Sequence, residues 1–378
     1  MSKIAAVNTY PIRAPLKRSH RTAHEARSDV ALLLVEVVTD DGIKGYGQVS
    51  STPMKDIAEW TAKLAPHVMG MNALAHNDVW EYLFALTSPR PAHPLGDGLP
   101  RGARPQIMAA IGGIDMALWD VAGKAAGMPV YQMLGADNRP LFAYGTGGYY
   151  VEGAPLTACA DELAGFVAAG YKGVKLKTGA DTIANEVKRI AATRAAIGPD
   201  ILLMLDMNAA YDLPACIEFA RAVAPYNIFW LEEPLHWYLQ PADFTQLARA
   251  TPIPLAHGER ELTRFTTRDF ITAGSIRYVQ FDATRAAGFT EALRIAHMAD
   301  HAGVMISPHQ APELHCHLVA AFPRTGFAVE SHGAPDRDPI WHGLFSERAQ
   351  LRDSYLYMND KPGFGITIDW DYARRHAA

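Results

Sequence analysis

Asp206, Glu232 and Glu259 each end a short apolar run, and they lie 26 and 27 residues apart. Such an interval fits one strand plus one helix of a parallel barrel. Since the carboxyl ends of those strands meet at one mouth, we expect the three carboxylates to lie close together. Their repulsion would favour proton uptake unless a cation neutralises them, and hard oxygen ligands select Mg²⁺ or a similar ion. For each residue alone, a helix N-cap or a rim salt bridge is the alternative.

Lys175 and Lys177 lie two residues apart in an apolar run, so on a strand both side chains point to the same face. Two lysines inside a closed barrel are costly unless they face anions. Their mutual repulsion would also lower the pKa of one of them toward neutrality. This pattern predicts a general base, and the alternative is a pair of exposed lysines on an edge strand.

His309 ends the run Val304–His309, and Asp282 ends the run before it. A carboxylate beside an imidazole fixes its tautomer and raises its basicity, which would give a second acid or base across the mouth from the lysines. Alone, a histidine here is more often a core or rim residue. A zinc cluster with His315 and His317 is a further alternative. It is less favoured because positions two apart do not share a helix face.

Two further polar residues complete the predicted mouth. Glu330 ends the last apolar run and can donate or accept a hydrogen bond at a developing oxyanion, with a simple rim carboxylate as the alternative. Asn208 lies two residues after Asp206, where it can support the metal ligands.

The elements that must position these residues recur at a regular interval. From Lys177 to Glu330 the ionisable ends of seven apolar runs follow one another every 21 to 29 residues, and the run Leu141–Gly145 makes eight candidate strands. Amphipathic segments between them predict helices, among them Leu156–Ala169, Ile183–Ile197 and Pro214–Val223. The fold class is therefore α/β, with a TIM barrel. The other runs are 174–177, 202–206, 228–232, 255–259, 278–282, 304–309 and 327–330.

The chain outside residues 131–344 has a different pattern. An Asp-Gly turn at 41–42 between apolar runs predicts a β-hairpin over 30–47. Helical spacing then predicts α-helices, and proline and glycine predict a loop over 89–105. We expect an N-terminal α+β domain over 1–130 and a C-terminal segment, 345–378, that packs back on the N-terminal sheet. The predicted helices are 56–69, 77–86 and 107–127.

Composition narrows the functional classes. The chain has 378 residues, 49% of them apolar, and its net charge of -5 is spread along the sequence, so no nucleic-acid partner is expected. No apolar run is long enough to cross a bilayer, and the N-terminus does not resemble a signal peptide. Three widely spaced cysteines, Cys159, Cys216 and Cys316, suit a reducing compartment. These features predict a cytoplasmic protein.

Taken together, these motifs resemble the enolase superfamily, in particular its mandelate racemase-like subgroup. The resemblance covers nearly the whole chain, and it depends on the order and spacing of the motifs rather than on any one of them. It implies an N-terminal α+β capping domain and a modified TIM barrel, (β/α)7β, in which the chain returns to the cap. The motifs are 114–124, Lys175-Leu176-Lys177, 205–208, 230–234, Gly258-Glu259, Asp282, Ser307-Pro308-His309, Glu330 and 362–365.

The resemblance also implies roles. Mg²⁺ would be the cofactor, and a small-molecule carboxylate would lose its α-proton to form an enediolate. We also expect the protein to form a homo-oligomer. The implied roles are Mg²⁺ binding for Asp206, Glu232 and Glu259, acid/base chemistry for Lys177 and for His309 with Asp282, neutralisation of the substrate carboxylate for Lys175, and a hydrogen bond to the enediolate for Glu330.

Three positions depart from the common pattern of that family or specify it further. Gln48 follows Gly45-Tyr46-Gly47 where an acidic residue is usual, which bears on substrate preference. His257 replaces a small residue. Arg260 follows the third carboxylate, as in several sugar-acid dehydratases of the group.

Substrate preference is expected from a mobile loop over residues 17–28, which contains no aromatic and no large aliphatic residue. This composition favours a polyhydroxylated or doubly acidic ligand, although a solvated surface loop is the alternative. The predicted substrate-binding residues are His20, Arg21, His24, Arg27, Tyr150, Asn208 and Arg260.

The leading hypothesis is a hydro-lyase that dehydrates a sugar acid, an aldonate or an aldarate, to a 2-keto-3-deoxy acid in sugar-acid catabolism. Lys177 or His309 would remove the α-proton, and His309 is the better candidate to protonate the departing hydroxyl. An isomerase (racemase or epimerase) needs the same two bases and is the nearest alternative. Lactone cycloisomerisation and a catalytically inactive sugar-acid-binding or structural protein stay open.

Overall fold

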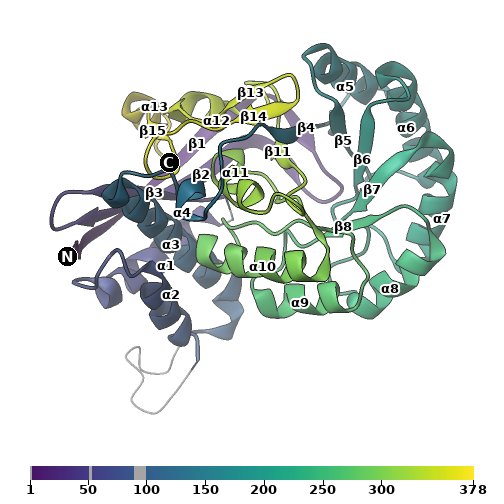
Figure 1. The fold of residues 1–378 in the computed structure, drawn as a ribbon. Coiled ribbons are helices and arrows are strands. Elements are labelled where there is room, and N and C mark those ends of the chain that lie inside the picture. Colours follow the sequence, from purple (N-terminus) through teal and green to yellow (C-terminus); the bar gives the residue numbers. More distant parts are fainter. Residues whose placement is uncertain (1, 51–52, 89–98) are drawn as a thin grey trace.

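The computed structural model describes residues 2–50, 53–88 and 99–378. Figure 1 shows an N-terminal group of strands and helices beside a barrel whose strands are surrounded by helices. In the described part of the chain no helix combines the length and apolarity needed to span a membrane. Residues 89–98 of the predicted loop lie outside the described residues.

The N-terminal group begins with an antiparallel sheet in the order β1 (Ile4–Arg21), β2 (Ala26–Thr39) and β3 (Lys44–Val49). The Asp-Gly turn is confirmed, and Gly42 has a φ of +89° that favours glycine. The long helix α3 packs against β3, where Gly45 and Gly47 allow close approach, because a Cβ at either residue would overlap the α3 backbone. The helices here are α1 (Met54–Val68), α2 (His76–Ala85), η1 (Arg101–Ala103), α3 (Arg104–Ala126) and α4 (Val130–Met133).

Eight parallel strands form the barrel, in the order β10-β9-β8-β7-β6-β5-β4-β11. Between its two ends, a single parallel bridge joins Ile306 of β10 to Gly326, just before β11, in place of a continuous ladder. The strands are β4 (Leu141–Gly147), β5 (Gly173–Lys177), β6 (Leu202–Asp206), β7 (Ile228–Glu232), β8 (Leu255–His257), β9 (Tyr278–Val279), β10 (Met305–Ile306) and β11 (Val329–Ser331).

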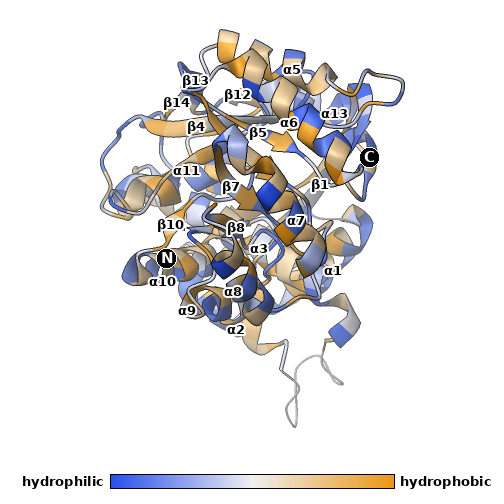
Figure 2. Ribbon diagram, turned by 90° about the vertical axis from the view of Figure 1, so that its right-hand side faces the viewer, coloured by the Kyte–Doolittle hydropathy of each residue, from blue (hydrophilic) through white to orange (hydrophobic). Residues whose placement is uncertain are grey.

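The helices that follow these strands form the outer layer and confirm the predicted alternation. Figure 2 shows hydrophobic residues along β4 and β7, whereas surrounding helices such as α7 carry both hydrophobic and hydrophilic residues. The helices are α5 (Ala158–Ala168), α6 (Ile183–Ile197), α7 (Leu213–Val223), η2 (Ala224–Tyr226), α8 (Pro241–Ala250), α9 (Arg264–Thr272), α10 (Phe289–Ala302) and α11 (Pro312–Ala321).

Three of the predicted strands end earlier than the sequence pattern indicated. Glu259, Asp282 and His309 lie in the loops after β8, β9 and β10, not on the strands themselves. After β8 the reason is local, because Gly258 has a φ of +132° that ends the extended conformation.

The prediction that residues 17–28 form a loop is wrong. The segment forms the end of β1, a turn and the start of β2, with His20 paired to Arg27 and Arg21 paired to Ala26. The turn is closed by a 2.9 Å hydrogen bond from the Thr22 amide to the Glu25 carbonyl. A polar composition does not exclude strands here, because a hairpin at the edge of a sheet can satisfy its backbone groups internally.

The C-terminal segment contacts both the barrel and the N-terminal sheet. Its hairpin β13–β14 pairs with β4, and the last residues pair with β1, where the Arg13 amide donates to the His376 carbonyl at 2.8 Å. The division of the chain after residues 130 and 344 stays a prediction. The elements are α12 (Pro339–Leu344), β12 (Phe345–Glu347), β13 (Gln350–Arg352), β14 (Tyr355–Tyr357), β15 (Thr367–Ile368) and α13 (Trp370–Arg375).

Asp120, fully buried on α3, connects three parts of the chain. Its carboxylate accepts hydrogen bonds from the Tyr46 amide of β3 (2.9 Å), the Phe364 amide of the C-terminal segment (2.9 Å) and the Lys124 ammonium (2.6 Å). Removing it would leave the Tyr46 and Phe364 amides without their acceptor and would take away the carboxylate partner of Lys124.

We predict that Asp120→Ala lowers the free energy of unfolding by about 3 kcal/mol, because breaking a buried charged network costs this much. Urea denaturation followed by circular dichroism measures the change. The matched control is Asp371→Ala, which removes an exposed aspartate of α13. Equal stability of the two variants would contradict the connecting role of Asp120.

Candidate metal centre and active site

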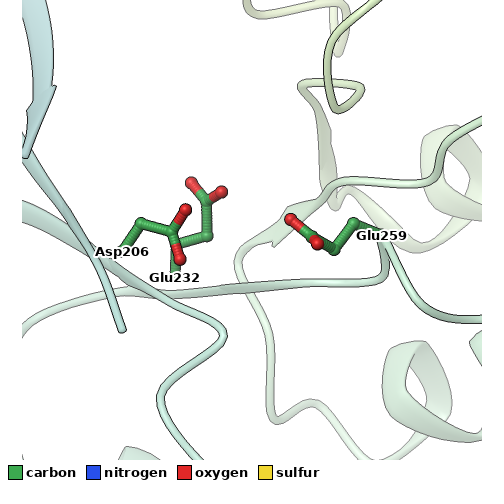
Figure 3. Close-up of side chains that lie close together, drawn as sticks. All are labelled: Asp206, Glu232 and Glu259. Carbon is green, nitrogen blue, oxygen red and sulfur yellow. The ribbon is translucent and has the colours of Figure 1, made fainter. Parts of the chain in front are cut away.

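Asp206 and Glu232 end the neighbouring strands β6 and β7, and Glu259 follows β8. Each offers a carboxylate oxygen, and these oxygens all lie within 4.8 Å of one another. Figure 3 shows Glu259 pointing toward the other two carboxylates. All three side chains are buried, and Glu259 Oε2 has no hydrogen-bond partner. A buried oxygen without a donor fits a cation ligand, so the trio is positioned to bind Mg²⁺.

The charge balance of the mouth agrees with a divalent cation. Burial raises the pKa of Glu232 well above its ordinary value, with Asp206 as the nearest repelling charge. Burial alone would also raise the pKa of Glu259, but His309 and Arg285 lower it well below its ordinary value. The trio therefore contains one carboxylate that is strongly ionised and one that needs additional positive charge.

Lys175 and Lys177 point into the barrel, as predicted, and both are buried. Lys177 contacts Asp206, while Lys175 contacts Glu232 and lies 2.8 Å from Glu330. Burial would lower both pKa values, but these carboxylates raise them above the ordinary lysine value. The predicted lowering by mutual repulsion is therefore wrong for this arrangement, because the anions contact the lysines directly.

His309 and Asp282 lie together, as the sequence predicted. The His309 Nδ1 atom is 2.9 Å from Asp282 Oδ2, and its Nε2 atom is 3.3 Å from Glu259 Oε2. Burial would raise the pKa of Asp282, but its hydrogen bond with His309 lowers it. An ionised Asp282 can accept the Nδ1 proton, which leaves Nε2 as the ring nitrogen that faces Glu259.

The zinc alternative is not supported by the positions of the other two histidines. His315 Nε2 accepts from the Ala283 amide at 3.1 Å, and His317 Nδ1 accepts from the Tyr131 amide at 3.0 Å. Within the described ranges, the group of side chains whose geometry could hold a metal ion is the carboxylate trio. Both histidines therefore act as structural acceptors.

Glu330 and Asn208 flank the trio differently. Glu330 accepts from Thr146 Oγ1 (2.6 Å) and from the Gln310 amide (3.0 Å), and although burial would raise its pKa, Lys175 lowers it. It is therefore an ionised acceptor that faces Lys175. The backbone amide of Asn208 donates to Asp206 Oδ1 at 2.9 Å, and the side-chain Oδ1 of Asn208 has no hydrogen-bond partner. Asn208 thus orients the first carboxylate of the trio.

A cavity of about 330 Å³ lies between the β1–β2 hairpin and the barrel mouth. Lys177, Glu259 and His309 line it from the barrel, and Lys175 and Glu330 are not among its lining residues. The proton-transfer candidates therefore share one polar space that a small carboxylate can enter.

Five of the seven predicted substrate-binding residues line this cavity, namely His20, His24, Arg27, Asn208 and Arg260. Arg21 and Tyr150 do not. Arg21 donates to the Ala180 carbonyl at 3.3 Å, and the Tyr150 hydroxyl donates to Glu186. Adjacent residues of a strand point to opposite faces, which explains why His20 lines the cavity and its neighbour Arg21 does not.

Several lining residues were missed from the sequence. Arg285 lies 3.1 Å from Glu259 and 3.4 Å from Asp282, and its position three residues after Asp282 was a usable signal. Arg337 donates to His20 Nδ1 at 2.9 Å, but its place in an irregular segment gave no signal. The other missed residues include Glu25, Trp237, Glu313 and His332.

Glu233 connects the loops that carry two of the carboxylates. It lies 2.8 Å from His257 at the end of β8 and 3.0 Å from Arg260. Burial would lower the pKa of His257, but Glu233 raises it to about 9. A protonated His257 therefore offsets the charge of Glu233, which follows Glu232 directly.

Curated relatives match nearly the whole chain. An arabinonate dehydratase of Saccharolobus solfataricus is 29% identical over 91% of this chain and 90% of its own. A D-galactonate dehydratase of Xanthomonas axonopodis pv. citri is 32% identical over the same shares of the two chains. Among solved structures, an L-talarate/galactarate dehydratase variant liganded with Mg and L-glucarate has a TM-score of 0.88 and 28% identity, over 100% of this chain and 92% of that one.

Family models match both parts of the chain. Residues 3–135 match the mandelate racemase/muconate lactonizing enzyme N-terminal domain, and residues 158–372 match the enolase C-terminal domain-like family. Together with the carboxylate trio at the barrel mouth, these matches place the chain in the enolase superfamily, among the mandelate racemase/muconate lactonizing enzymes.

Proposed function

We propose that this protein is a Mg²⁺-dependent hydro-lyase that dehydrates a sugar acid to a 2-keto-3-deoxy acid. The observation that carries the proposal is the polar cavity that Lys177 of β5, His309 after β10 and Glu259 line together, with Glu259 close to the other two carboxylates of the trio. The dehydratases among the relatives support this reaction class.

Asp206, Glu232 and Glu259 would bind the metal. Bound Mg²⁺ supplies positive charge that offsets the negative charge developing on the substrate carboxylate when its α-proton leaves. In the ion pair with Asp206, Lys177 is protonated, and it can act as a base only after that carboxylate no longer contacts it. Lys175, which does not line the cavity, contacts both Glu232 and Glu330 and offsets part of their negative charge.

His309 is the candidate to protonate the departing hydroxyl at the carbon next to the α-carbon. Its Nδ1 is fixed by Asp282, so Nε2 is the atom that gains or gives a proton in the cavity. The protonated ring would lie between Asp282 and Glu259, both of which stabilise an imidazolium. Elimination then yields an enol, which becomes the 2-keto-3-deoxy acid.

A racemase or epimerase is the second candidate, because bases on two sides of a cavity also allow proton removal from one face and return to the other. Lactone cycloisomerisation and an inactive sugar-acid-binding or structural protein stay alternatives. The cytoplasmic location and the homo-oligomeric state also stay predictions.

The reaction class is tested with purified protein, Mg²⁺ and a library of aldonic and aldaric acids. We predict semicarbazide-reactive 2-keto product from at least one acid, because the site contains both a base and an acid. In parallel, NMR in D₂O measures exchange of the α-proton. Exchange without ketone would identify an epimerase instead, and inertness in both assays across the library would favour the binding protein.

We predict that Asp206→Asn weakens Mg²⁺ binding by about 100-fold or more, because it removes a charged ligand atom from the trio. Isothermal titration calorimetry measures the affinity without any substrate. Asp200→Asn, which changes an exposed aspartate after α6, is the matched control. Unchanged affinity in Asp206→Asn would exclude this residue as a ligand.

We predict that His309→Asn lowers kcat by about 10²- to 10⁴-fold, since asparagine cannot transfer a proton. Mg²⁺ affinity measured by calorimetry should stay within a few-fold of the wild-type value. His301→Asn, at an exposed residue near the end of α10, controls for loss of a histidine elsewhere. Full activity of His309→Asn would refute its acid/base role.

A further inference from the structure

Gln48 of β3 and Glu313 of α11 meet in the wall of the active-site cavity. Each is only 3% exposed, and Gln48 Nε2 donates a hydrogen bond to Glu313 Oε1. The remaining oxygens, Gln48 Oε1 and Glu313 Oε2, have no hydrogen-bond partner in the protein. Buried acceptors without donors are costly, so a ligand that donates hydrogen bonds here would be favoured.

The position of this pair fits the tail of a substrate. The carboxylate trio and its lysines lie at the barrel mouth, whereas Gln48 enters the cavity from the N-terminal sheet. A sugar acid whose carboxylate lies beside the trio must extend its carbon chain toward that sheet. Gln48 and Glu313 can therefore meet the end of the chain that does not react.

The charges of the cavity wall do not favour a second carboxylate at that end. Arg27 already lies 2.7 Å from Glu25, and Arg260 lies 3.0 Å from Glu233. The other two lining arginines, Arg285 and Arg337, contact Glu259 and Glu162 at 3.1 and 2.5 Å. Every lining arginine thus has a carboxylate partner.

Glu313 itself would repel a second carboxylate. Burial raises the pKa of Glu313 to about 7, so the side chain becomes negatively charged only as the pH rises above that value. A terminal hydroxyl can donate to its free oxygen, whereas a terminal carboxylate carries the same charge and no proton.

We propose that Gln48 and Glu313 are specificity-determining residues that bind the terminal hydroxyl of an aldonate and disfavour the aldarate of the same configuration. This inference rests on the proposed sugar-acid dehydration and specifies its substrate class.

The test compares kcat/KM at pH 8 for each aldonate of five or six carbons and the aldarate of the same configuration, which differ only at the terminal carbon. We expect the wild-type enzyme with Mg²⁺ to prefer the best aldonate by about 100-fold or more, because like charges in contact cost several kcal/mol. An equal rate or a preference for the aldarate would overturn the inference.

Glu313→Gln keeps the shape of the side chain and removes its charge. We expect the aldarate-to-aldonate ratio of kcat/KM to rise by about tenfold or more, with a loss on the aldonate and a gain on the aldarate. Glu218→Gln, on the exposed side of α7, is the matched control and should leave the ratio unchanged. A ratio that does not rise in Glu313→Gln contradicts the proposal.

A measurement on the wild-type enzyme covers the case in which Glu313→Gln does not fold. The best aldonate should lose about tenfold in kcat/KM when its terminal hydroxyl is replaced by hydrogen. A loss below twofold would overturn the inference.

Calorimetry separates this inference from the proposed function. If no acid is turned over, the dehydration proposal fails, and binding of the same aldonate and aldarate pairs to the Mg²⁺-loaded protein decides the specificity. Tighter binding of the aldonate supports the role of Gln48 and Glu313, and equal or absent binding overturns it.

Discussion

Buried charge is the constraint on which the barrel mouth depends. Five buried carboxylates gather there, and they face three permanent cations, Lys175, Lys177 and Arg285, which leaves two negative charges. Isolated charges in a protein interior are costly, and the two excess charges match one divalent cation, whereas a cationic His309 alone would offset only one of them. The same imbalance that would destabilise an apolar core is what makes the site able to bind metal. The carboxylates are Asp206, Glu232, Glu259, Asp282 and Glu330.

The barrel satisfies this constraint by placing oppositely charged side chains on adjacent levels of its interior, where they contact one another. Strand register places Lys177 beside Asp206 and Asp206 beside Glu232, whereas two residues earlier Lys175, Met204 and Trp230 are neighbours. Lys175 is the charged residue at this second level, and it adjoins an apolar layer that includes Tyr144, Met204 and Trp230. That layer excludes water from one side, and the N-terminal sheet covers the other. Charge interactions in the cavity are therefore stronger than they would be at an open surface.

The sequence predicted those parts of the fold and of the site that follow the recurring strand-and-helix pattern. Apolar runs ending in Asp206 and Glu232 revealed the strands, and their common direction implied the shared mouth. The β1–β2 hairpin was misinterpreted because its polar residues lack the alternation that marks a half-buried strand. Arg21 and Tyr150 were expected in the cavity but point away from it. Neighbouring side chains of an extended segment point to opposite faces, and nothing in the sequence showed which face lines the cavity. Arg337 comes from a distant irregular segment, where no periodic pattern in the sequence marks which side chains reach the cavity.

His257 shows how one departure from the family pattern can be accommodated. A larger side chain than usual at the end of β8 needs a partner, and Glu233, directly after Glu232 of the trio, provides it at 2.8 Å. Glu233 has a φ of +44°, a conformation that non-glycine residues rarely adopt without support from their surroundings. Its contacts with His257 and Arg260 give that support from the loop that carries Glu259. The spacing of Glu232 and Glu259 is thereby coupled to His257, which is not one of the three carboxylates, so the surrounding charged residues also shape the predicted metal site.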